Sequence, residues 1–410
     1  MGKTELSIKQ NMLWNSFGSL VNLGCQWLMT VIVVRLANGY EAAGVFSLAV
    51  SVYGIFGVVA QYRMYTYQVS DVQNENAVGE YLAFRLVTNA ASLVLCMLYA
   101  VVTCAPDTWF AIFLYGLYRA VALMVDVFHA CDQRHHRMDL IGQSLALQGI
   151  ISLIMFIVVF YVTGNLELSI AVMAIAAAVV GLAFDFPRTR RLEKISFGIS
   201  RQKAVYLVVT CFPIVIAGVI ASATPTVPRQ YLALAMGADA LGVYASVAAP
   251  VAIIQMGASY VYNPLLGYFS ERFFKKDRKG FVSLFLKSAA LIALIGVVCS
   301  LLLAVLGESL LVFVFGESIR PFAYLLLPLV GLAVLTGYLW FLNDLLISFR
   351  NFKGTFIGCI VSFAVALVIM VPMVSTFGMN GVTFAGLVST LAGIVAMGVA
   401  LHAQLRRWFE

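Results

Sequence analysis

The chain has 410 residues, of which 62% are hydrophobic and only 11% are charged. Soluble globular proteins carry about 25% charged residues, so this composition excludes a soluble enzyme or a soluble binding domain. The formal net charge is +7, which we attribute to a basic rim facing anionic lipid headgroups rather than to nucleic-acid binding.

Apolar runs long enough to cross about 30 Å of hydrocarbon follow one another along the whole chain. We expect twelve of them, near 12–34, 42–62, 81–103, 108–130, 141–163, 168–184, 204–226, 240–264, 284–306, 323–347, 355–375 and 382–404. Runs of this length favour helices over barrel strands, because a helix satisfies its own backbone hydrogen bonds in lipid. The sequence therefore predicts an all-α membrane protein with about twelve transmembrane helices.

A hydrophilic stretch divides these helices into two sets of six. We expect an N-terminal lobe at 1–184, a cytoplasmic linker at 185–203 and a C-terminal lobe at 204–410. The segments 33–55 and 227–253 resemble each other, because in each an Arg ends one helix and a Gly-Val-aromatic triplet opens the next. Such a parallel repeat predicts two pseudo-symmetric lobes around a central cavity that holds the substrate.

The distribution of basic residues predicts the orientation. If the N-terminus is cytoplasmic, the 26 Lys and Arg residues lie in cytoplasmic segments with four exceptions, which are Arg35, Arg119, Arg229 and Arg320. Because cytoplasmic loops carry an excess of Lys and Arg, this asymmetry predicts that both termini are cytoplasmic.

Polar residues follow one face of the first helix. They recur every three or four residues, at Asn11, Asn15, Ser19, Asn22 and Gln26, which is the spacing of a single helical stripe. Such a stripe is typical of a wall facing a hydrated cavity, and also of hydrogen bonds between packed helices. On the first interpretation Asn15, Asn22 and Gln26 are candidate substrate ligands.

Charged residues inside the spans are the stronger candidates. Arg119 lies near the middle of the fourth span, and Asp126 follows on the same face two helical turns later. A central Arg costs about 2.5–3.5 kcal/mol, so intramembrane charges are functional candidates; the alternative here is a mutual ion pair. Arg85 either snorkels or binds substrate. Arg35 and Arg229 end the first helix of each lobe, and Arg229 has the alternative of an interfacial anchor.

Two acidic residues, Asp126 and Asp344, are candidates for coupling transport to a proton or sodium ion; Asp344 has the alternative of simple exposure to cytoplasmic water. We also expect Pro213 and Pro225 to break the seventh helix, which would present Arg229 to a cavity.

The seven cysteines show no disulfide framework or metal spacing, and no nucleotide-binding motif is present. We therefore expect no metal and no cofactor.

The exit of the fourth helix, DVFHACDQRHHRMDLIGQSLALQGI, resembles the corresponding segment of polysaccharide flippases of the multidrug/oligosaccharidyl-lipid/polysaccharide superfamily. The residues that carry this resemblance are Asp126, Gln133, Arg137, Met138, Asp139 and Ser144. The segments NMLWNSFGSLVNLGCQWLMTVIVVRL, VPRQYLALAMGADALGVYASVA, FGESIRPFAYLLLPL and FGMNGVTFAGLVST agree with the family as well. The chain is similar over nearly its whole length to Wzx-like exporters of O-antigen, capsule and teichoic-acid precursors.

The resemblance implies two six-helix bundles that alternate between inward-open and outward-open states in the bacterial plasma (inner) membrane. It implies that cavity arginines hold the diphosphate of an undecaprenyl-linked oligosaccharide. Arg119 fits that role best by position, with Arg85 and Arg229 next. The expected partners are the lipid-linked oligosaccharide, membrane lipids, and a glycan polymerase or ligase of the same pathway.

Two other functions stay open. A cation-coupled drug antiporter of the same fold would need an acidic cavity, whereas the outer candidates here are basic. A membrane glycan polymerase or ligase would need a sizeable external loop with catalytic residues, whereas the expected outer loops are short and contain no His. The sequence therefore favours a flippase, not an enzyme, as its first prediction.

Overall fold

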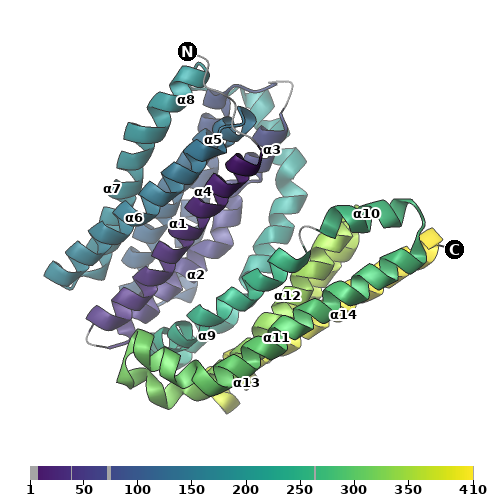
Figure 1. The fold of residues 1–410 in the computed structure, drawn as a ribbon. Helices are drawn as coiled ribbons and strands as arrows, with labels where there is room; N and C mark the ends of the chain where they lie inside the picture. The colour runs from purple at the N-terminus through teal and green to yellow at the C-terminus, as the bar shows by residue number, and fades with distance from the viewer. Residues whose placement is uncertain (1–7, 38, 72–74, 263–264, 410) are drawn as a thin grey trace. The chain divides into compact units, whose positions relative to one another are not determined.

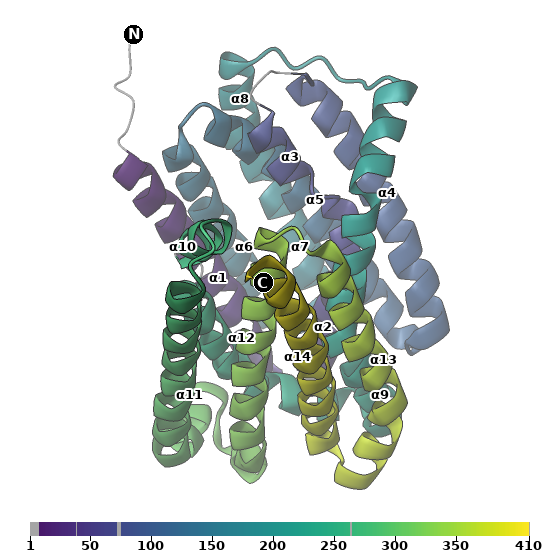
Figure 2. The same cartoon turned by 90° about the vertical axis from the view of Figure 1, so that its right-hand side faces the viewer.

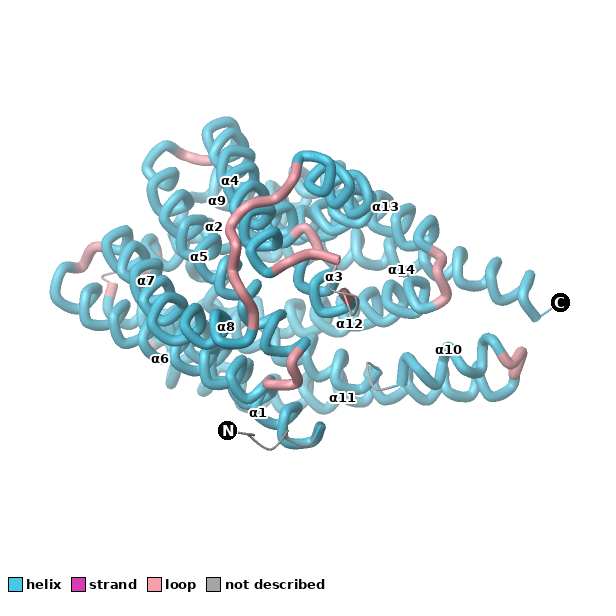
Figure 3. The backbone as a smooth tube through the Cα atoms, turned by 90° about the horizontal axis from the view of Figure 1, so that it is seen from above, coloured by secondary structure: helices cyan, strands magenta, loops and turns pink. Residues whose placement is uncertain are grey.

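The computed structural model describes residues 8–37, 39–71, 75–262 and 265–409, and over these residues the chain is helical with no strand (Figures 1 and 3). The helices in chain order are α1 (Ile8–Leu36), α2 (Glu41–Gln61), α3 (Met64–Ser70), α4 (Val78–Thr103), α5 (Trp109–Arg134), α6 (Met138–Thr163), α7 (Leu166–Val180), α8 (Phe186–Leu192), α9 (Arg201–Tyr262), α10 (Leu266–Phe274), α11 (Arg278–Phe315), α12 (Leu326–Ser348), α13 (Phe352–Phe377) and α14 (Met379–Phe409). A π-helical turn at Gly181–Asp185 joins α7 to α8, and a 3-10 segment at Glu317–Leu325 precedes α12. The predicted all-α class is confirmed.

Eleven helices in the described part of the chain are long and apolar enough to cross a membrane. One of them covers 59 residues of α9, Arg201–Ser259, which at 1.5 Å per residue is about 90 Å long. That length is enough for two crossings of about 30 Å. Together these helices account for the twelve predicted spans of a multi-pass membrane protein.

The break in α9 lies at Gly237, where the backbone leaves the helical region with φ 89° and ψ 168°. The prediction that Pro213 and Pro225 break this helix is wrong, because the chain stays helical at both. A proline removes one helical hydrogen bond but keeps a helical φ. Glycine, which lacks a Cβ, can adopt the positive φ that separates the two parts of α9.

The chain forms two compact units, Met1–Val219 and Ile220–Glu410, so the division falls inside α9. Residues 201–219 of α9 belong to the first unit, where Leu207, Cys211 and Val215 pack into a buried apolar cluster. The predicted boundary at 185–203 stays a prediction. That stretch contains α8 and a non-helical connection at 193–200, visible in Figure 3 as the long loop after α8.

In the first unit α1 lies along α6 at very short range. A Cβ added to Gly18 would lie 2.1 Å from the carbonyl oxygen of Gly142, and a Cβ added to Gly142 would lie 2.1 Å from the carbonyl oxygen of Trp14. Small residues let transmembrane helices approach in this way and gain van der Waals contact. This contact sets which face of α1 meets α6.

Helix α5 is the centre of the first unit, because it packs against α2, α4, α6 and α7. The sequence of α5 suits this position, because the residues between Trp109 and Arg134 are mostly apolar and only a few are charged. A charge on this helix is therefore enclosed by protein on several sides. Arg119 and Asp126 are both on α5.

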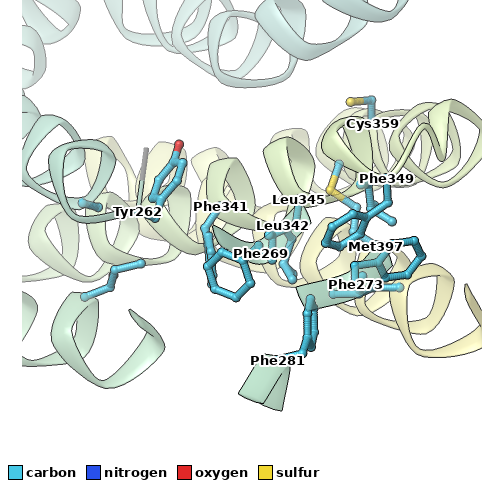
Figure 4. Packing of buried hydrophobic residues seen from close by; sticks show 14 residues of the cluster. Tyr262, Phe269, Phe273, Phe281, Phe341, Leu342, Leu345, Phe349, Cys359 and Met397 are labelled. Carbon is cyan, nitrogen blue, oxygen red and sulfur yellow. The ribbon is translucent and has the colours of Figure 1, made fainter. Parts of the chain in front are cut away.

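In the second unit α14 packs against α12 and α13, and α11 lies along α12 (Figure 2). Around α10 the core is aromatic, and Phe273 stacks on Phe349 with 4.3 Å between ring centroids (Figure 4). Phe273 also stacks on Trp408, with 5.0 Å between the centroids. By contrast, α11 exposes large apolar side chains, since Val305 and Phe313 are 79% and 80% exposed. Exposed apolar surface on this scale is expected where a helix faces lipid.

Candidate functional site

Arg119 is half-buried on α5. Its guanidinium lies within electrostatic range of the hydroxyls of Tyr53, Tyr115 and Tyr118 and of the Asp126 carboxylate. Among the residues that the structure describes, it makes no hydrogen bond and no ion pair. A guanidinium carries five N–H donors, so Arg119 has donors available in a helix that lies within the predicted membrane.

A small cavity lies beside Arg119 in the first unit. Its volume is about 80 Å³, which is room for several water molecules. The lining residues come from α1, α2, α5 and α7 and are Gln26, Met29, Thr30, Phe46, Val50, Tyr115, Tyr118 and Met173. Tyr118 and Tyr115, which precede Arg119 by one and four residues, are both among the lining residues. Arg119 itself is not among the lining residues.

Arg85 is fully enclosed, with 0% exposure. One nitrogen, Nη1, donates to the carbonyl oxygens of Ala60 and Gln61, at 3.1 and 2.5 Å, and Nη2 donates to Asp126 at 3.2 Å. Those two carbonyls belong to the last turn of α2, where carbonyls lack helical partners and the helix dipole is negative. Arg85 therefore caps α2, and most of its donors are already committed to the protein.

The alternative of a mutual Arg119–Asp126 ion pair is not what the structure contains. Asp126 pairs with Arg85 instead, and its side chain is 29% exposed. Seven residues along one helix span about 10 Å, so the closer partner is the one on the neighbouring α4. The role predicted for Asp126 in coupling transport to an ion stays a prediction. The structure adds that this carboxylate is paired with Arg85.

The polar stripe of α1 divides between two roles. Asn11 accepts a hydrogen bond from the backbone N–H of Met138 at 2.9 Å, and Asn22 donates to the carbonyl of Leu145 at 3.0 Å. Both bonds reach α6, so these two asparagines join packed helices. Gln26 donates to the Asn22 side chain at 2.7 Å and also lines the cavity. Asn15 is half-buried, and its side chain makes no hydrogen bond to the described residues.

The remaining predicted ligands lie in other surroundings. Arg35 is exposed in the last turn of α1. Arg229 is half-buried on α9, with its Cζ 6.0 Å from the centroid of the Tyr244 ring, and the Tyr244 hydroxyl is 3.2 Å from that of Thr383. Arg229 thus contributes a cation–π contact within the second unit. Its role in binding substrate stays a prediction.

Asp344 lies on α12, where it accepts a hydrogen bond from the Tyr262 hydroxyl at 2.9 Å and another from Asn343 at 3.3 Å. Its side chain is half-buried. The carboxylate is therefore held by the protein rather than simply exposed at the helix end. Whether it couples transport to an ion stays a prediction.

A buried polar network near the end of α5 was not among the predicted sites. The Ser144 hydroxyl donates to Asp185 at 2.8 Å and lies 2.9 Å from His129 Nε2, while Gln148 donates to Ser144 at 3.0 Å. One oxygen of Asp132 and one of Asp185 are buried with no hydrogen-bond partner in the described part of the chain. The sequence analysis placed Asp185 in a hydrophilic linker and so did not predict that this residue is buried, with 1% exposure.

Comparison with known proteins identifies the fold. No protein-family model matches the chain. The capsular polysaccharide biosynthesis protein CapF of Staphylococcus aureus is 22% identical over 305 residues, covering 72% of this chain and 74% of CapF. The lipid II flippase MurJ, in an inward closed conformation, has a TM-score of 0.74 at 11% identity and covers 96% of this chain and 87% of its own.

An inward-facing multidrug resistance MATE family transporter of the MOP superfamily has a TM-score of 0.68 at 12% identity, with coverage of 97% and 99%. MOP stands for the multidrug/oligosaccharidyl-lipid/polysaccharide superfamily. At these identities the likeness shows the fold, in which helices are grouped in two lobes. The predicted resemblance to this superfamily is confirmed.

Proposed function

We propose that this chain is a flippase that moves an undecaprenyl-diphosphate-linked oligosaccharide from the cytoplasmic to the outer leaflet by alternating access. The product would serve the synthesis of a surface polysaccharide such as O-antigen, capsule or teichoic acid. The observation that carries the proposal is Arg119, a cation inside a transmembrane helix whose donors meet no acceptor in the described structure. The similarity to CapF and the fold shared with MurJ support it.

The chemistry of Arg suits a diphosphate. Its planar guanidinium donates two parallel hydrogen bonds to phosphate oxygens and is more weakly hydrated than a Lys ammonium. Moving a diphosphate and sugar hydroxyls through hydrocarbon without such partners would cost too much free energy. In this proposal Arg119 replaces the water around the diphosphate, and the polyprenyl chain stays in lipid.

The small cavity beside Arg119 suits water rather than a glycan. Pockets that hold drug-sized ligands have volumes of about 300–1,000 Å³, whereas this one has about 80 Å³. We therefore assign to Gln26, Tyr115 and Tyr118 the role of holding water close to the cation. The oligosaccharide must bind outside this cavity or after the first unit has opened.

The membrane potential can drive the export. An inside-negative potential moves an anion outward with about 2.3 kcal/mol per charge per 100 mV. For a diphosphate with two negative charges this is sufficient without a coupled ion, so we propose a uniporter. Transport should then persist at fixed potential when the pH or sodium gradient is removed. Transport that stops under those conditions would instead favour coupling through Asp126 or Asp344.

The test is a precursor-accumulation assay in cells that depend on this chain. Arg119→Ala should accumulate the lipid-linked precursor and lose surface glycan, whereas Arg119→Lys should retain part of the function because it keeps the charge. Arg320→Ala is the matched control, since Arg320 is exposed and paired with Glu317 at 2.9 Å. All variants must be inserted at wild-type levels. Normal surface glycan in both Arg119 variants would refute the proposal.

A further inference from the structure

Three metal-ligating side chains meet where α5 ends. The Cys131 Sγ lies 3.4 Å from Oε1 of Glu193, and His135 Nε2 lies 2.9 Å from the same oxygen. All three ligand atoms are within 4.8 Å of one another. Cys131 is buried, Glu193 is half-buried and His135 is exposed, so the cluster is closed on the protein side and open on the solvent side.

The local fold explains why these residues meet. Cys131 is on the last turn of α5, and His135 is the residue that caps this helix, its backbone N–H donating to the Cys131 carbonyl at 3.1 Å. A spacing of four residues in this helical turn brings the two side chains to one face. Glu193 is the first residue after α8, and its backbone N–H donates to the carbonyl of Thr189 at 2.9 Å. The cluster therefore joins the end of α5 to the beginning of the non-helical connection 193–200. All of these residues belong to the first unit.

The donor set selects a particular class of metal. Thiolate, imidazole and carboxylate together are the ligands of zinc, whereas magnesium and calcium prefer oxygen alone. With bond lengths of about 2.0–2.3 Å, tetrahedral zinc ligands lie about 3.3–3.6 Å apart. Two of the distances here, 2.9 and 3.4 Å, are within a few tenths of an ångström of that range. Three protein ligands leave a fourth position for water.

We propose that Cys131, His135 and Glu193 bind a zinc-class divalent cation. The bound ion fastens the 193–200 connection to α5. The sequence alone did not reveal the site, because the third ligand is 58 residues away from His135.

Arg134 is the competitor for the metal. Its Nη2 donates to the same Glu193 oxygen, while its Nη1 is buried without a hydrogen bond and lies 4.0 Å from Oδ2 of Asp71. When a cation takes Glu193, the Arg134 guanidinium has Asp71 as its alternative acceptor.

Cobalt binding by the purified full-length protein in detergent, after treatment with a chelator, tests the site. We expect about one Co²⁺ per chain and a near-ultraviolet thiolate-to-cobalt charge-transfer band, with Zn²⁺ but not Mg²⁺ displacing the cobalt. Cys131→Ser should abolish the band. His135→Ala and Glu193→Gln should each weaken Co²⁺ binding by at least about tenfold. Mutation of residues that only hydrogen-bond to metal ligands already lowers metal affinity by about tenfold or more.

Two variants control for nonspecific effects. His136→Ala removes the neighbouring exposed His, and Cys359→Ser removes a buried thiol of the second unit; both should bind Co²⁺ like the wild type. Arg134→Gln should bind Co²⁺ more tightly, which a purely structural cluster would not predict. Helical content by circular dichroism verifies that each variant is folded. Absence of the band in the wild type, or its persistence in Cys131→Ser, would overturn the proposal.

Discussion

Arg85 of α4 and Asp126 of α5 form an ion pair with 3.2 Å between Nη2 and Oδ2, and the same guanidinium binds two carbonyls at the end of α2. One side chain thus joins three helices of the first unit. A buried charge is costly unless it is paired and hydrogen-bonded. Both Nη atoms of Arg85 meet this condition, whereas its Nε is buried without a hydrogen-bond partner in the described residues. This pair leaves Arg119 as the cation on α5 that lacks a partner in the described structure.

Removal of Arg85 should destabilise the protein. Arg85→Ala leaves Asp126 and the α2 carbonyls without their donor, and breaking a buried pair costs about 3–5 kcal/mol. Replacement of both partners by Leu should cost less than Arg85→Ala alone. Thermal unfolding in detergent measures this, with Lys287→Ala, an exposed residue of α11, as the control. An unchanged melting temperature for Arg85→Ala would contradict the assignment.

The contact between α1 and α6 should not tolerate a methyl group. Gly142→Ala places a Cβ 2.1 Å from the Trp14 carbonyl oxygen, so the two helices must separate. Overpacking of this kind costs about 1–3 kcal/mol. Gly24→Ala is the matched control on α1, because nothing lies within 4 Å of its added Cβ. Equal melting temperatures for the two variants would show that the helices are not in close contact.

Replacement of Gly237 should strain the backbone. Its φ of 89° and ψ of 168° lie in a region that is almost exclusive to glycine, and other residues there cost about 1–3 kcal/mol. Gly237→Ala should lower the melting temperature by a corresponding amount. Gly257→Ala, at a helical position of the same element with only an ordinary contact at 3.8 Å, should not. If both variants melt alike, the break in α9 lies elsewhere.

Acid should weaken the hydrogen bonds that Asp71, the residue after α3, accepts. Burial raises the pKa of Asp71, but hydrogen bonds from the backbone N–H groups of Glu75 and Asn76 and from the Tyr81 hydroxyl hold it below its ordinary value. A depressed pKa in the folded state stabilises the protein above the unfolded pKa of about 3.9. That stabilisation is lost as the pH falls through the folded pKa.

Asp71→Asn removes this pH-dependent stabilisation. The variant should therefore melt below the wild type at pH 7, and the difference should narrow below about pH 4. Melting temperatures of the two proteins measured across this range provide the check. A difference that stays constant with pH would show that ionisation of Asp71 does not contribute.

The sequence by itself determined the membrane class, the helical content and the succession of apolar spans. Each of these depends on a local property, since about 20 apolar residues in lipid must form a helix to satisfy their own backbone. It also identified Arg119 as unusual, because the cost of a charge in a span does not depend on the neighbouring helices.

Only the tertiary structure decided which polar groups meet. The partner of Asp126 is on α4, the acceptors of Arg85 are on α2, and Glu193 reaches Cys131 from beyond α8. Along a single span, periodicity shows which residues share a face but not which helix that face meets. That choice is made by close contacts such as Gly18 against Gly142, which set the rotation and distance of each helix.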